Sequence, residues 1–550
     1  MRKQRVAALV GSSTILKSTQ ATRRVLWVIT WVAFLLRVPN LAGQSLWRDE
    51  VDAIRFSNWS LGQLLGSLFR EGHNGPLFFL LLRPWRTLAG NSEFALRYPS
   101  ALLGVLAVPL GYVLARQLGF GRRVGLLLSL LLATSPYLIW YGQEAKMYTL
   151  LLVLVLLAFI AYLKALMNSP LPGREGLGEG QTPSIVHPGG KKSRIWWFFF
   201  VVATSLSFYT HILSPLMLVI YGLVAGLHPA QLRRHWRGWL ISMACLTLPY
   251  LPLALWQASL FFQKFESGHP FYPLDRQVFI LLQLYSSGLV RFAGLTAIIL
   301  FVFLWLCGLF LPGSGVGSRG TERTDASRLT PHASRFTFPA PRLTLAGWTL
   351  LPPLIVYLIS LRVAVFEDRY LIYIVPAFYL LIALGLVLVR RYSRLLAGLG
   401  LGLLLTINLL GIWQQQRQPI KADFRAAGAY LAGQPQAPAM VMVQMPYLRH
   451  TLRYYYKGNY KILEGLWTNN GKTEAEVDAE MTALTADLSE LWLVVSEEEA
   501  WDNRRLTRAW LDANAQQVEQ AHFMRVDLYR YQFQPGIIES QSVGSELINR

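Results

Sequence analysis

The first side chains that could do chemistry are two adjacent acids, Asp49 and Glu50, in the stretch GQSLWRDEVDAIRFS. They follow the first long apolar run of the chain, VLWVITWVAFLLRVPNLAG. Charge near the hydrocarbon of a bilayer costs free energy, so acids at such a place call for a reason. One reason is structural, an acidic cluster at a helix end that pairs with Arg48 and Arg55. The other is catalytic, because a carboxylate can remove the proton of an attacking hydroxyl.

Other charged or titratable groups also stand in the segments that connect apolar runs. They are the acids Asp52, Glu144, Glu367 and Asp368, the cations Arg97, Lys146, Arg362 and Arg369, and the histidines His73 and His211. Arg and Lys are the usual charge partners of a phosphate. A carboxylate base and two or three cations beside apolar helices would suit sugar transfer from a lipid-phosphate donor whose tail stays in the bilayer.

Each of these residues also has a structural explanation. Glu144 and Lys146 could form an ion pair within a loop, and Arg97 could anchor a helix end by snorkelling. His211 is expected to be packed or hydrogen-bonded rather than a ligand. The run YYY at 454–456 favours the core of a domain over a sugar platform.

The composition indicates a membrane protein. Of 550 residues, 53% are hydrophobic and 15% are charged, against about 25% charged in soluble domains. The net charge of +21 does not indicate nucleic-acid binding, because much of the Lys and Arg lies in short clusters between apolar runs. The two cysteines, Cys245 and Cys307, each lie in an apolar run, so no disulfide framework or zinc motif is present.

The apolar runs number about eleven on the criterion of about 20 residues per span. They are 24–42, 98–115, 124–141, 147–166, 195–210, 212–228, 239–260, 280–310, 346–363, 370–389 and 395–413. The pair at 195–228 could be a hairpin or one broken helix. Starting from a cytoplasmic tail over 1–23, with a retained signal anchor, the loops predicted to be inside are all basic, as the positive-inside rule requires. Two of these loops, 167–194 and 311–345, are rich in Gly, Pro and Ser and are predicted to be disordered linkers.

This topology places the 43–97 loop, the acids named above and everything after 413 on the outer face. The 43–97 loop contains amphipathic stretches that suit helices at the membrane interface. Residues 414–550 lack the long apolar runs of the preceding segment. In them, stretches with a helical pattern alternate with stretches with a strand pattern. KADFRAAGAYLAG and EAEVDAEMTALTADL are predicted helices, and APAMVMVQM, ELWLVVS and VEQAHFMRVDLYRYQF are each predicted as one strand. We therefore expect a small extracytoplasmic α/β domain.

Five stretches carry a family resemblance, in order along roughly 24–415. They are SLWRDE, HNGPLFFLLLRPWRTLAGNSEFALRYPSALLGVLAV, SPYLIWYGQEAKMYTLLL, SFYTHILSPLML and EDRYLIYIVPAFYLLIALGL. They resemble the GT-C glycosyltransferases of the protein O-mannosyltransferase and aminoarabinose transferase group, the bacterial family 39-like membrane proteins. The resemblance implies a polytopic α-helical GT-C fold with about eleven transmembrane helices in 24–413.

The same resemblance implies roles for individual residues. Asp49 would be the general base and Glu50 would bind or orient the acceptor. Glu144 would be a second acid facing the site, with Arg97, Lys146 and Arg369 as phosphate contacts and Tyr370 as a further substrate contact. His73 stands where the family has His-Pro-Pro-Leu, but this chain has His-Asn-Gly-Pro-Leu, so the role of that loop is open.

The implied reaction is inverting direct displacement, without a covalent intermediate. Its partners would be a polyprenyl-phosphate-linked sugar, membrane lipid and an extracytoplasmic acceptor, which could be protein, lipid or glycan; no nucleic acid is expected. The chain would be a multi-pass protein of the bacterial cell membrane. Some relatives bind a divalent metal ion near the site; no residues here have decisive ligand spacing.

Two functions of other classes compete with this one. A transporter or flippase of a lipid-linked saccharide would place charges within spans and use paired broken helices in two halves. The sequence shows only the interruption YTHILSP. A membrane scaffold without catalysis would not depend on Asp49.

Overall fold

The computed structural model describes residues 2–70, 72–167, 191–263, 269–290, 294–312 and 339–534. These form two compact units. The helical unit comprises Met1–Asn40, Trp59–Gly90 and Ala95–Gln415, and the α/β unit comprises Leu41–Asn58, Asn91–Phe94 and Gln416–Arg550. The predicted disordered linkers over 167–194 and 311–345 lie largely outside the described residues.

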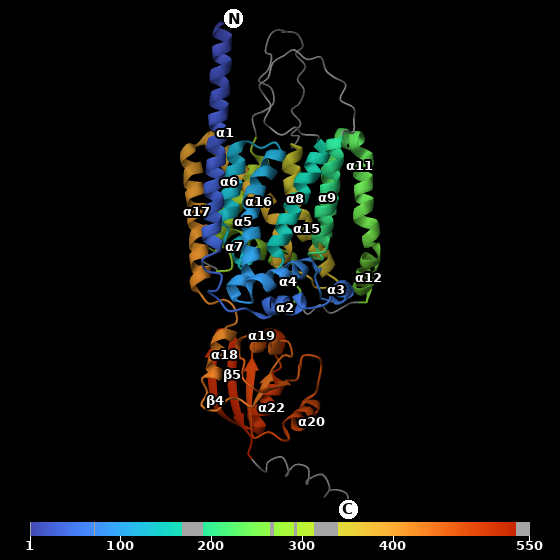
Figure 1. The fold of residues 1–550 in the computed structure, drawn as a ribbon, viewed down its shortest axis with the longest axis vertical. Coiled ribbons are helices and arrows are strands. Elements are labelled where there is room, and N and C mark those ends of the chain that lie inside the picture. The colour runs from blue at the N-terminus through green and yellow to red at the C-terminus, as the bar shows by residue number, and fades with distance from the viewer. Residues whose placement is uncertain are drawn as a thin grey trace, which may run out of the picture. The chain divides into compact units, whose positions relative to one another are not determined.

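Helices make up the helical unit, and Figure 1 shows most of them running side by side along one direction. They are α1 (Arg2–Arg37), α3 (Leu61–Gly66), η1 (Ser67–Phe69), α4 (Leu77–Ala89), α5 (Glu93–Gln117), α6 (Arg122–Thr134), α7 (Pro136–Gly142), α8 (Tyr148–Met167), α9 (Lys191–Phe208), η2 (Ser214–Leu216), α10 (Met217–Leu227), α11 (Pro229–Thr247), η3 (Leu248–Tyr250), α12 (Leu251–Phe262), α13 (Leu274–Ser287), α14 (Gly294–Phe310), α15 (Ala340–Ser360), η4 (Asp368–Ile374), α16 (Val375–Tyr392) and α17 (Arg394–Arg417). The predicted tail over 1–23 is thus the start of α1.

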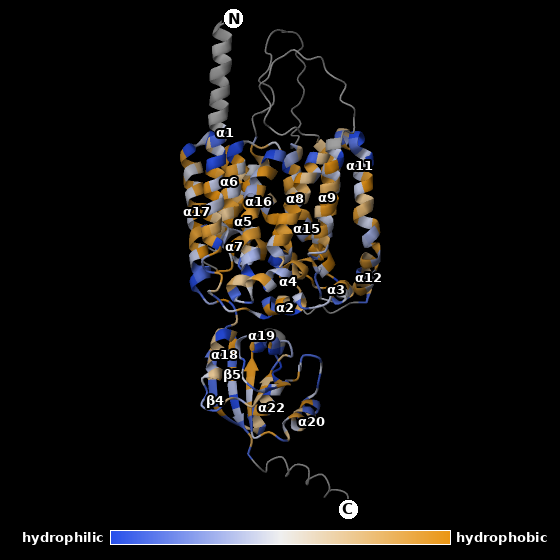
Figure 2. Ribbon diagram, viewed as in Figure 1, coloured by the Kyte–Doolittle hydropathy of each residue, from blue (hydrophilic) through white to orange (hydrophobic). Residues whose placement is uncertain are grey.

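Within the described residues, six helices are long and apolar enough to cross a membrane, and the bent pair α6–α7 makes a seventh. The six are Glu93–Gln117, Tyr148–Met167, Pro229–Phe262, Ala340–Ser360, Asp368–Tyr392 and Arg394–Arg417. Shorter apolar helices cover Ser193–Phe208, Ser214–Leu227 and Gly294–Phe310. Figure 2 shows their apolar residues along the lengths of the helices and polar residues near the ends.

Each of the eleven predicted apolar runs coincides largely with helix, with one correction. The run 280–310 is not one span, because α13 ends at Ser287 and α14 begins at Gly294. Gly288 follows α13 with φ +80°, a left-handed conformation that favours glycine and ends a helix. The pair at 195–228 is resolved as two helices, α9 and α10, joined by the turn over 209–213 and η2.

The bend between α6 and α7 has a local cause. Pro136 lacks a backbone N–H and cannot continue the hydrogen bonding of α6, and Ser135 caps the new helix by accepting from the Leu138 amide. The break leaves the last carbonyl groups of α6 without helical partners. The fully buried Arg37 donates to two of them, Leu132 O and Ala133 O, at 2.8 Å each.

Helices α14 and α16 meet at two glycines. A Cβ on Gly308 would lie 2.0 Å from the carbonyl oxygen of Leu381, and a Cβ on Gly385 would lie 2.0 Å from that of Leu304. Small residues allow two apolar helices to approach this closely. The contact fixes α16, which continues from the 3₁₀ helix η4, where Arg369 and Tyr370 lie.

The described residues of the α/β unit form a five-stranded mixed sheet, in the order β2-β1-β3-β5-β4. The strands β2, β1 and β3 are parallel, and β5 is antiparallel to both β3 and β4. Its elements are α2 (Arg48–Ser57), α18 (Phe424–Ala432), β1 (Met440–Val443), α19 (Leu448–Tyr455), β2 (Lys461–Glu464), α20 (Glu474–Thr485), β3 (Glu490–Val495), α21 (Glu498–Trp501), α22 (Leu506–Asn514), β4 (Gln516–Phe523) and β5 (Val526–Gln532).

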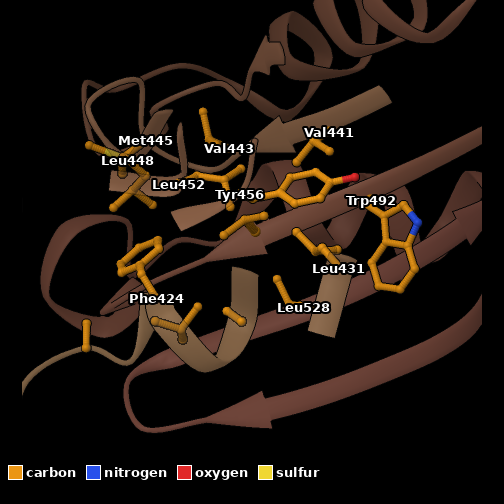
Figure 3. Close-up of a cluster of buried hydrophobic side chains, with 14 residues drawn as sticks. Phe424, Leu431, Val441, Val443, Met445, Leu448, Leu452, Tyr456, Trp492 and Leu528 are labelled. Carbon is orange, nitrogen blue, oxygen red and sulfur yellow. The ribbon is translucent and has the colours of Figure 1, made fainter. Parts of the chain in front are cut away.

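Apolar clusters lie on both faces of this sheet. Val441 and Val443 of β1 belong to the cluster drawn in Figure 3, with side chains of α18 and α19. Met442, between them, belongs to the other cluster, with side chains of α20 and α22. This alternation is the period of two that a strand buried on both faces must show.

The structure confirms the α/β domain and changes some of its details. VEQAHFMRVDLYRYQF is not one strand but the hairpin β4–β5, whose turn contains Arg525 at φ +55°. In the run YYY only Tyr456 is buried in the core. The expected boundary lay at residues 413 and 414, whereas the α/β unit begins at Gln416 and also takes in residues 41–58 and 91–94 of the first loop.

Candidate functional site

The stretch before α2 is hydrogen-bonded to the start of the C-terminal segment, within the α/β unit. Gln44 Oε1 accepts from the amides of Ile420 and Lys421 at 3.0 Å each. Ser45 Oγ donates to the carbonyl oxygen of Ala422 at 2.6 Å, and the Leu46 amide donates to the Tyr455 hydroxyl. These contacts fix where α2 begins and therefore where its first-turn acids lie.

Asp49 and Glu50 occupy the first turn of α2, yet they have different surroundings. Asp49 is half-buried, and its charge acts on the Tyr447 hydroxyl. Glu50 is fully buried, and its Oε2 lies 2.9 Å from Nζ of Lys421. No pattern in the sequence predicts this ion pair, which joins positions 371 residues apart.

Asp52, on the same helix, makes a pairing of the kind expected for these acids. Asp52 lies 3.9 Å from the guanidinium of Arg48 and 3.4 Å from that of Arg55. The Arg48 guanidinium also packs over the ring of Tyr447, 3.7 Å from its centroid. Burial raises the pKa of Tyr447 to about 12, so the phenol beside Asp49 stays protonated at neutral pH.

A second group of polar residues lies in the helical unit, where α7, the 143–147 turn and η4 meet. The Tyr141 hydroxyl donates to Asp368 Oδ2 at 2.8 Å, and the Tyr137 hydroxyl donates to the Asp368 carbonyl oxygen at 2.9 Å. The charges of Arg369 and Glu144 also act on Tyr141. The bend at Pro136 places both tyrosines here.

His211 lies beside this group, in the turn between α9 and η2. Its ring is 4.7 Å from that of Tyr370, and the charges of Arg369 and Lys146 act on it. Burial, with the two cations adding to it, lowers the pKa of His211 to about 3, so the imidazole is neutral at physiological pH. We call Glu144, Lys146, His211, Arg369 and Tyr370, together with Tyr141 and Asp368, the polar cluster.

The polar cluster has a partly exposed edge. Glu144 and Lys146 are buried, whereas 18% of the Arg369 side chain is exposed. Glu367 lies 3.7 Å from Arg369 and 3.2 Å from His269 Nδ1. At this edge Arg369, Glu367 and His269 are all partly exposed.

The loop that begins with His73 contacts the turn that holds His211. The Leu77 amide donates to the carbonyl oxygen of Tyr209 at 2.9 Å. A Cβ on Gly75 would lie 2.1 Å from the same oxygen, so the departure from His-Pro-Pro-Leu allows a close backbone approach. His73 itself is half-buried, with its ring 5.8 Å from that of Trp59.

Arg97 is buried on α5, with 2% of its surface exposed. A snorkelling arginine keeps its charged group in water, so this burial argues against an anchoring role.

The 43–97 loop contains helices α2, α3 and α4, as its amphipathic stretches predicted.

The described residues include no group of three or more His, Cys, Asp or Glu side chains placed to hold a metal ion. Pairs of such side chains do occur among them, His269 with Glu367 and His522 with Asp527. Two ligands do not make a divalent metal site, so no step of the chemistry below passes through a metal.

Comparisons with known proteins agree with the resemblance found in the sequence. Residues 73–171 match the family model of the dolichyl-phosphate-mannose-protein mannosyltransferases. This segment contains His73, Arg97, Glu144 and Lys146. No curated protein matches the chain.

Solved structures match over nearly the whole chain. ArnT from Cupriavidus metallidurans bound to undecaprenyl phosphate is 15% identical, with a TM-score of 0.52 over 92% of this chain and 97% of that one. The same protein in the apo state is 16% identical, with a TM-score of 0.53 over 93% of this chain and 98% of that one. The Archaeoglobus fulgidus oligosaccharyltransferase complexed with zinc and sulfate is 14% identical, with a TM-score of 0.52 over 92% of this chain and 72% of that one. The chain has the GT-C fold.

Sequence reasoning missed three residues, Arg37, Tyr141 and Lys421, whose hydrogen bonds or ion pairs hold elements of this fold together. Two of them could have been found from the sequence. Arg37 is a charge inside the first apolar run, and Tyr141 lies within the quoted SPYLIWYGQEAKMY stretch. Lys421 could not, because nothing in KADFRAAGAYLAG distinguishes an exposed lysine from one paired with Glu50. His211 was expected to be packed or hydrogen-bonded rather than a ligand, and it lies within the polar cluster, where its Nδ1 accepts from the Leu213 amide.

Proposed function

We propose that this chain is a membrane glycosyltransferase that moves a sugar from a polyprenyl-phosphate-linked donor to an acceptor on the outer face of a bacterial membrane. The observation that carries the proposal is the match of residues 73–171 to the mannosyltransferase family model, because this segment supplies Arg97, Glu144 and Lys146. The GT-C fold and the structure of ArnT with undecaprenyl phosphate support the choice of donor.

The proposed reaction is one inverting displacement. The acceptor oxygen bonds to the anomeric carbon of the sugar while the bond from that carbon to the phosphate oxygen breaks. The acceptor proton passes to the carboxylate of Asp49, and the electron pair leaves with the polyprenyl phosphate. A positioned base contributes about 10²–10⁴ in rate. The phosphate is a weak base, so cations can stabilise it without a general acid.

Lys146, Arg369 and Arg97 are the proposed contacts of the donor phosphate, with Tyr370, His73 and Glu144 as further substrate contacts. Two of the three cations, Lys146 and Arg369, act on one side chain, His211, so they can serve one anion together. We assign Glu50 to holding α2 rather than to contacting the acceptor, because its carboxylate is fully buried against Lys421.

The test uses purified full-length protein in lipid nanodiscs with undecaprenyl-phosphate-linked mannose, glucose and aminoarabinose, and a membrane extract as the source of acceptors. We expect sugar to be transferred and undecaprenyl phosphate released, with the configuration at the anomeric carbon inverted. In proteoliposomes, a flippase would move the intact donor across the bilayer without releasing undecaprenyl phosphate. That second outcome would overturn the proposal.

A pair of variants tests the phosphate contact in the same assay. Arg369→Gln removes the guanidinium of the partly exposed arginine in the polar cluster and should raise the KM for the donor about tenfold or more, because a charged hydrogen bond is lost. Arg362→Gln is the matched control. Arg362 is exposed and donates to the carbonyl oxygens of Phe261 and Phe262, at 3.3 and 3.2 Å. The KM of the Arg362→Gln variant for the donor should stay near that of the wild type.

A further inference from the structure

Nε2 of His211 is a buried polar atom with no hydrogen-bond partner among the described residues. The whole side chain is inaccessible, with 0% of its surface exposed. Buried polar groups in folded proteins nearly always have a partner, and leaving one unpaired costs stability. An exception of this kind calls for an explanation in terms of what the atom binds.

The other ring nitrogen determines what Nε2 can bind. Nδ1 of His211 accepts a hydrogen bond from the Leu213 amide at 3.1 Å, so Nδ1 carries the lone pair. In a neutral imidazole the proton is then on Nε2, which makes that atom a donor. The neutral form is the one expected here, because burial and two neighbouring cations lower the pKa of His211 to about 3. The partner of Nε2 must therefore be an acceptor.

The surroundings favour a negatively charged acceptor. The charges of Lys146 and Arg369 act on the imidazole, and the ring of Tyr370 lies 4.7 Å away. A cation would be repelled at this place, whereas an oxyanion would be attracted by both charges and would accept from Nε2–H. A phosphate has several oxygens and can accept from three donors at once.

We infer that Nε2–H of His211 donates a hydrogen bond to a phosphate oxygen that Lys146 and Arg369 also contact. This deepens the proposed function and rests on it, since the phosphate would be that of the polyprenyl-linked donor. A free phosphate ion offers the same chemistry, so the test must separate the two sources. His211 thus supplies a neutral donor beside two cations, and it orients the phosphate without adding a third charge.

Two substitutions separate the two nitrogens. His211→Asn keeps an acceptor near the position of Nδ1, for the Leu213 amide, and removes the donor at Nε2. His211→Gln reaches the position of Nε2 with an amide N–H and gives up the acceptor at Nδ1. If the residue only stabilised its turn, Asn would be the milder change, whereas a phosphate donor makes Gln the milder change.

The measurement is binding of undecaprenyl phosphate to the purified full chain in nanodiscs, with undecaprenol as the lipid without phosphate and inorganic phosphate as competitor. We expect His211→Asn to weaken binding of undecaprenyl phosphate about 10- to 100-fold and His211→Gln to stay within about threefold. Binding of undecaprenol should be the same in all three proteins. Competition by inorganic phosphate that depends on His211 supports a general phosphate site, and its absence supports a site for the lipid-linked group.

Wild-type affinity in His211→Asn, or equal losses in both variants, would overturn the inference. So would a wild-type chain that binds undecaprenyl phosphate no better than undecaprenol. Because binding is measured without turnover, the two proposals can fail separately. Binding that depends on His211 without sugar transfer would remove only the proposed function, and transfer with unchanged binding in His211→Asn would remove only this inference.

Discussion

Nζ of Lys421 lies 2.9 Å from Oε2 of Glu50, and both side chains are buried. The pair joins the first turn of α2, where Asp49 lies, to the segment that leads into α18. Two buried charges are costly unless each has its partner, so the pair stabilises the contact only while both members are present. The pair therefore fixes the position of the first turn of α2 against the segment before α18, although the two are distant in the sequence.

We predict that removing one member of this pair destabilises the α/β unit. Glu50→Gln or Lys421→Met should each cost about 3–5 kcal/mol, since the other charge stays buried and loses the partner 2.9 Å away. The double variant Glu50→Leu, Lys421→Met should recover most of the loss. The measurement is the melting midpoint of the purified protein.

Lys472 provides the control for this prediction, because it forms a partly exposed pair with Glu480. Lys472→Met should change stability by at most about 1 kcal/mol. Losses in the Glu50–Lys421 double variant that equal the sum of the single losses would contradict a coupled buried pair.

Gly75→Ala should separate the loop that begins at His73 from the turn over 209–213. The added Cβ would lie 2.1 Å from the Tyr209 carbonyl oxygen, and backbone cannot move aside as a flexible side chain can. We expect a loss of about 1–3 kcal/mol in stability, as for other overpacked sites, and lower transfer activity. Gly66→Ala is the control, since its Cβ would meet no atom within 4 Å. Equal behaviour of the two variants would show that the loop does not need this close approach.

His450 makes the stability of the α/β unit depend on pH. Burial, with Arg55, Arg449 and Arg453 adding to it, lowers the pKa of His450 to about 4, below about 6.5 in the unfolded chain. Between these values the unfolded state binds the proton and the folded state does not, so stability falls as the pH falls from about 6.5 toward 4. The melting midpoint measured from pH 7.5 to 4.5 should show this decline, and His450→Asn should flatten it. An equal decline in the variant would assign the effect to other groups.

The sequence was sufficient for features that depend on periodicity. The apolar runs gave the helices, and the alternation in 414–550 gave the α/β domain. The errors occurred where one residue decides the local structure. Gly288 ends α13 inside the run 280–310, which hydropathy alone predicts as one span, and Arg525 lies in the turn that makes an alternating stretch the hairpin β4–β5.

The candidate site was predictable in its residue types but not in its pairings. The resemblance pointed to Glu144, Lys146, Arg369 and Tyr370, which the structure brings into the polar cluster. No local rule could predict that Glu50 pairs with Lys421, or that the guanidinium of Arg37 caps α6, because those partners are fixed by tertiary contacts.

We propose that the acceptor proton passes to one carboxylate, that of Asp49, and turnover by Asp49→Asn tests this proposal most directly. The assay is sugar transfer from an undecaprenyl-phosphate-linked donor, with donor binding measured in parallel. Asp52→Asn is the matched control, since Asp52 lies on the same helix and pairs with Arg48 and Arg55. We predict that Asp49→Asn lowers kcat by about 10²–10⁴ with donor binding retained, and that Asp52→Asn stays within a few-fold of the wild type. Near-normal turnover by Asp49→Asn would contradict the assignment of Asp49 as the base.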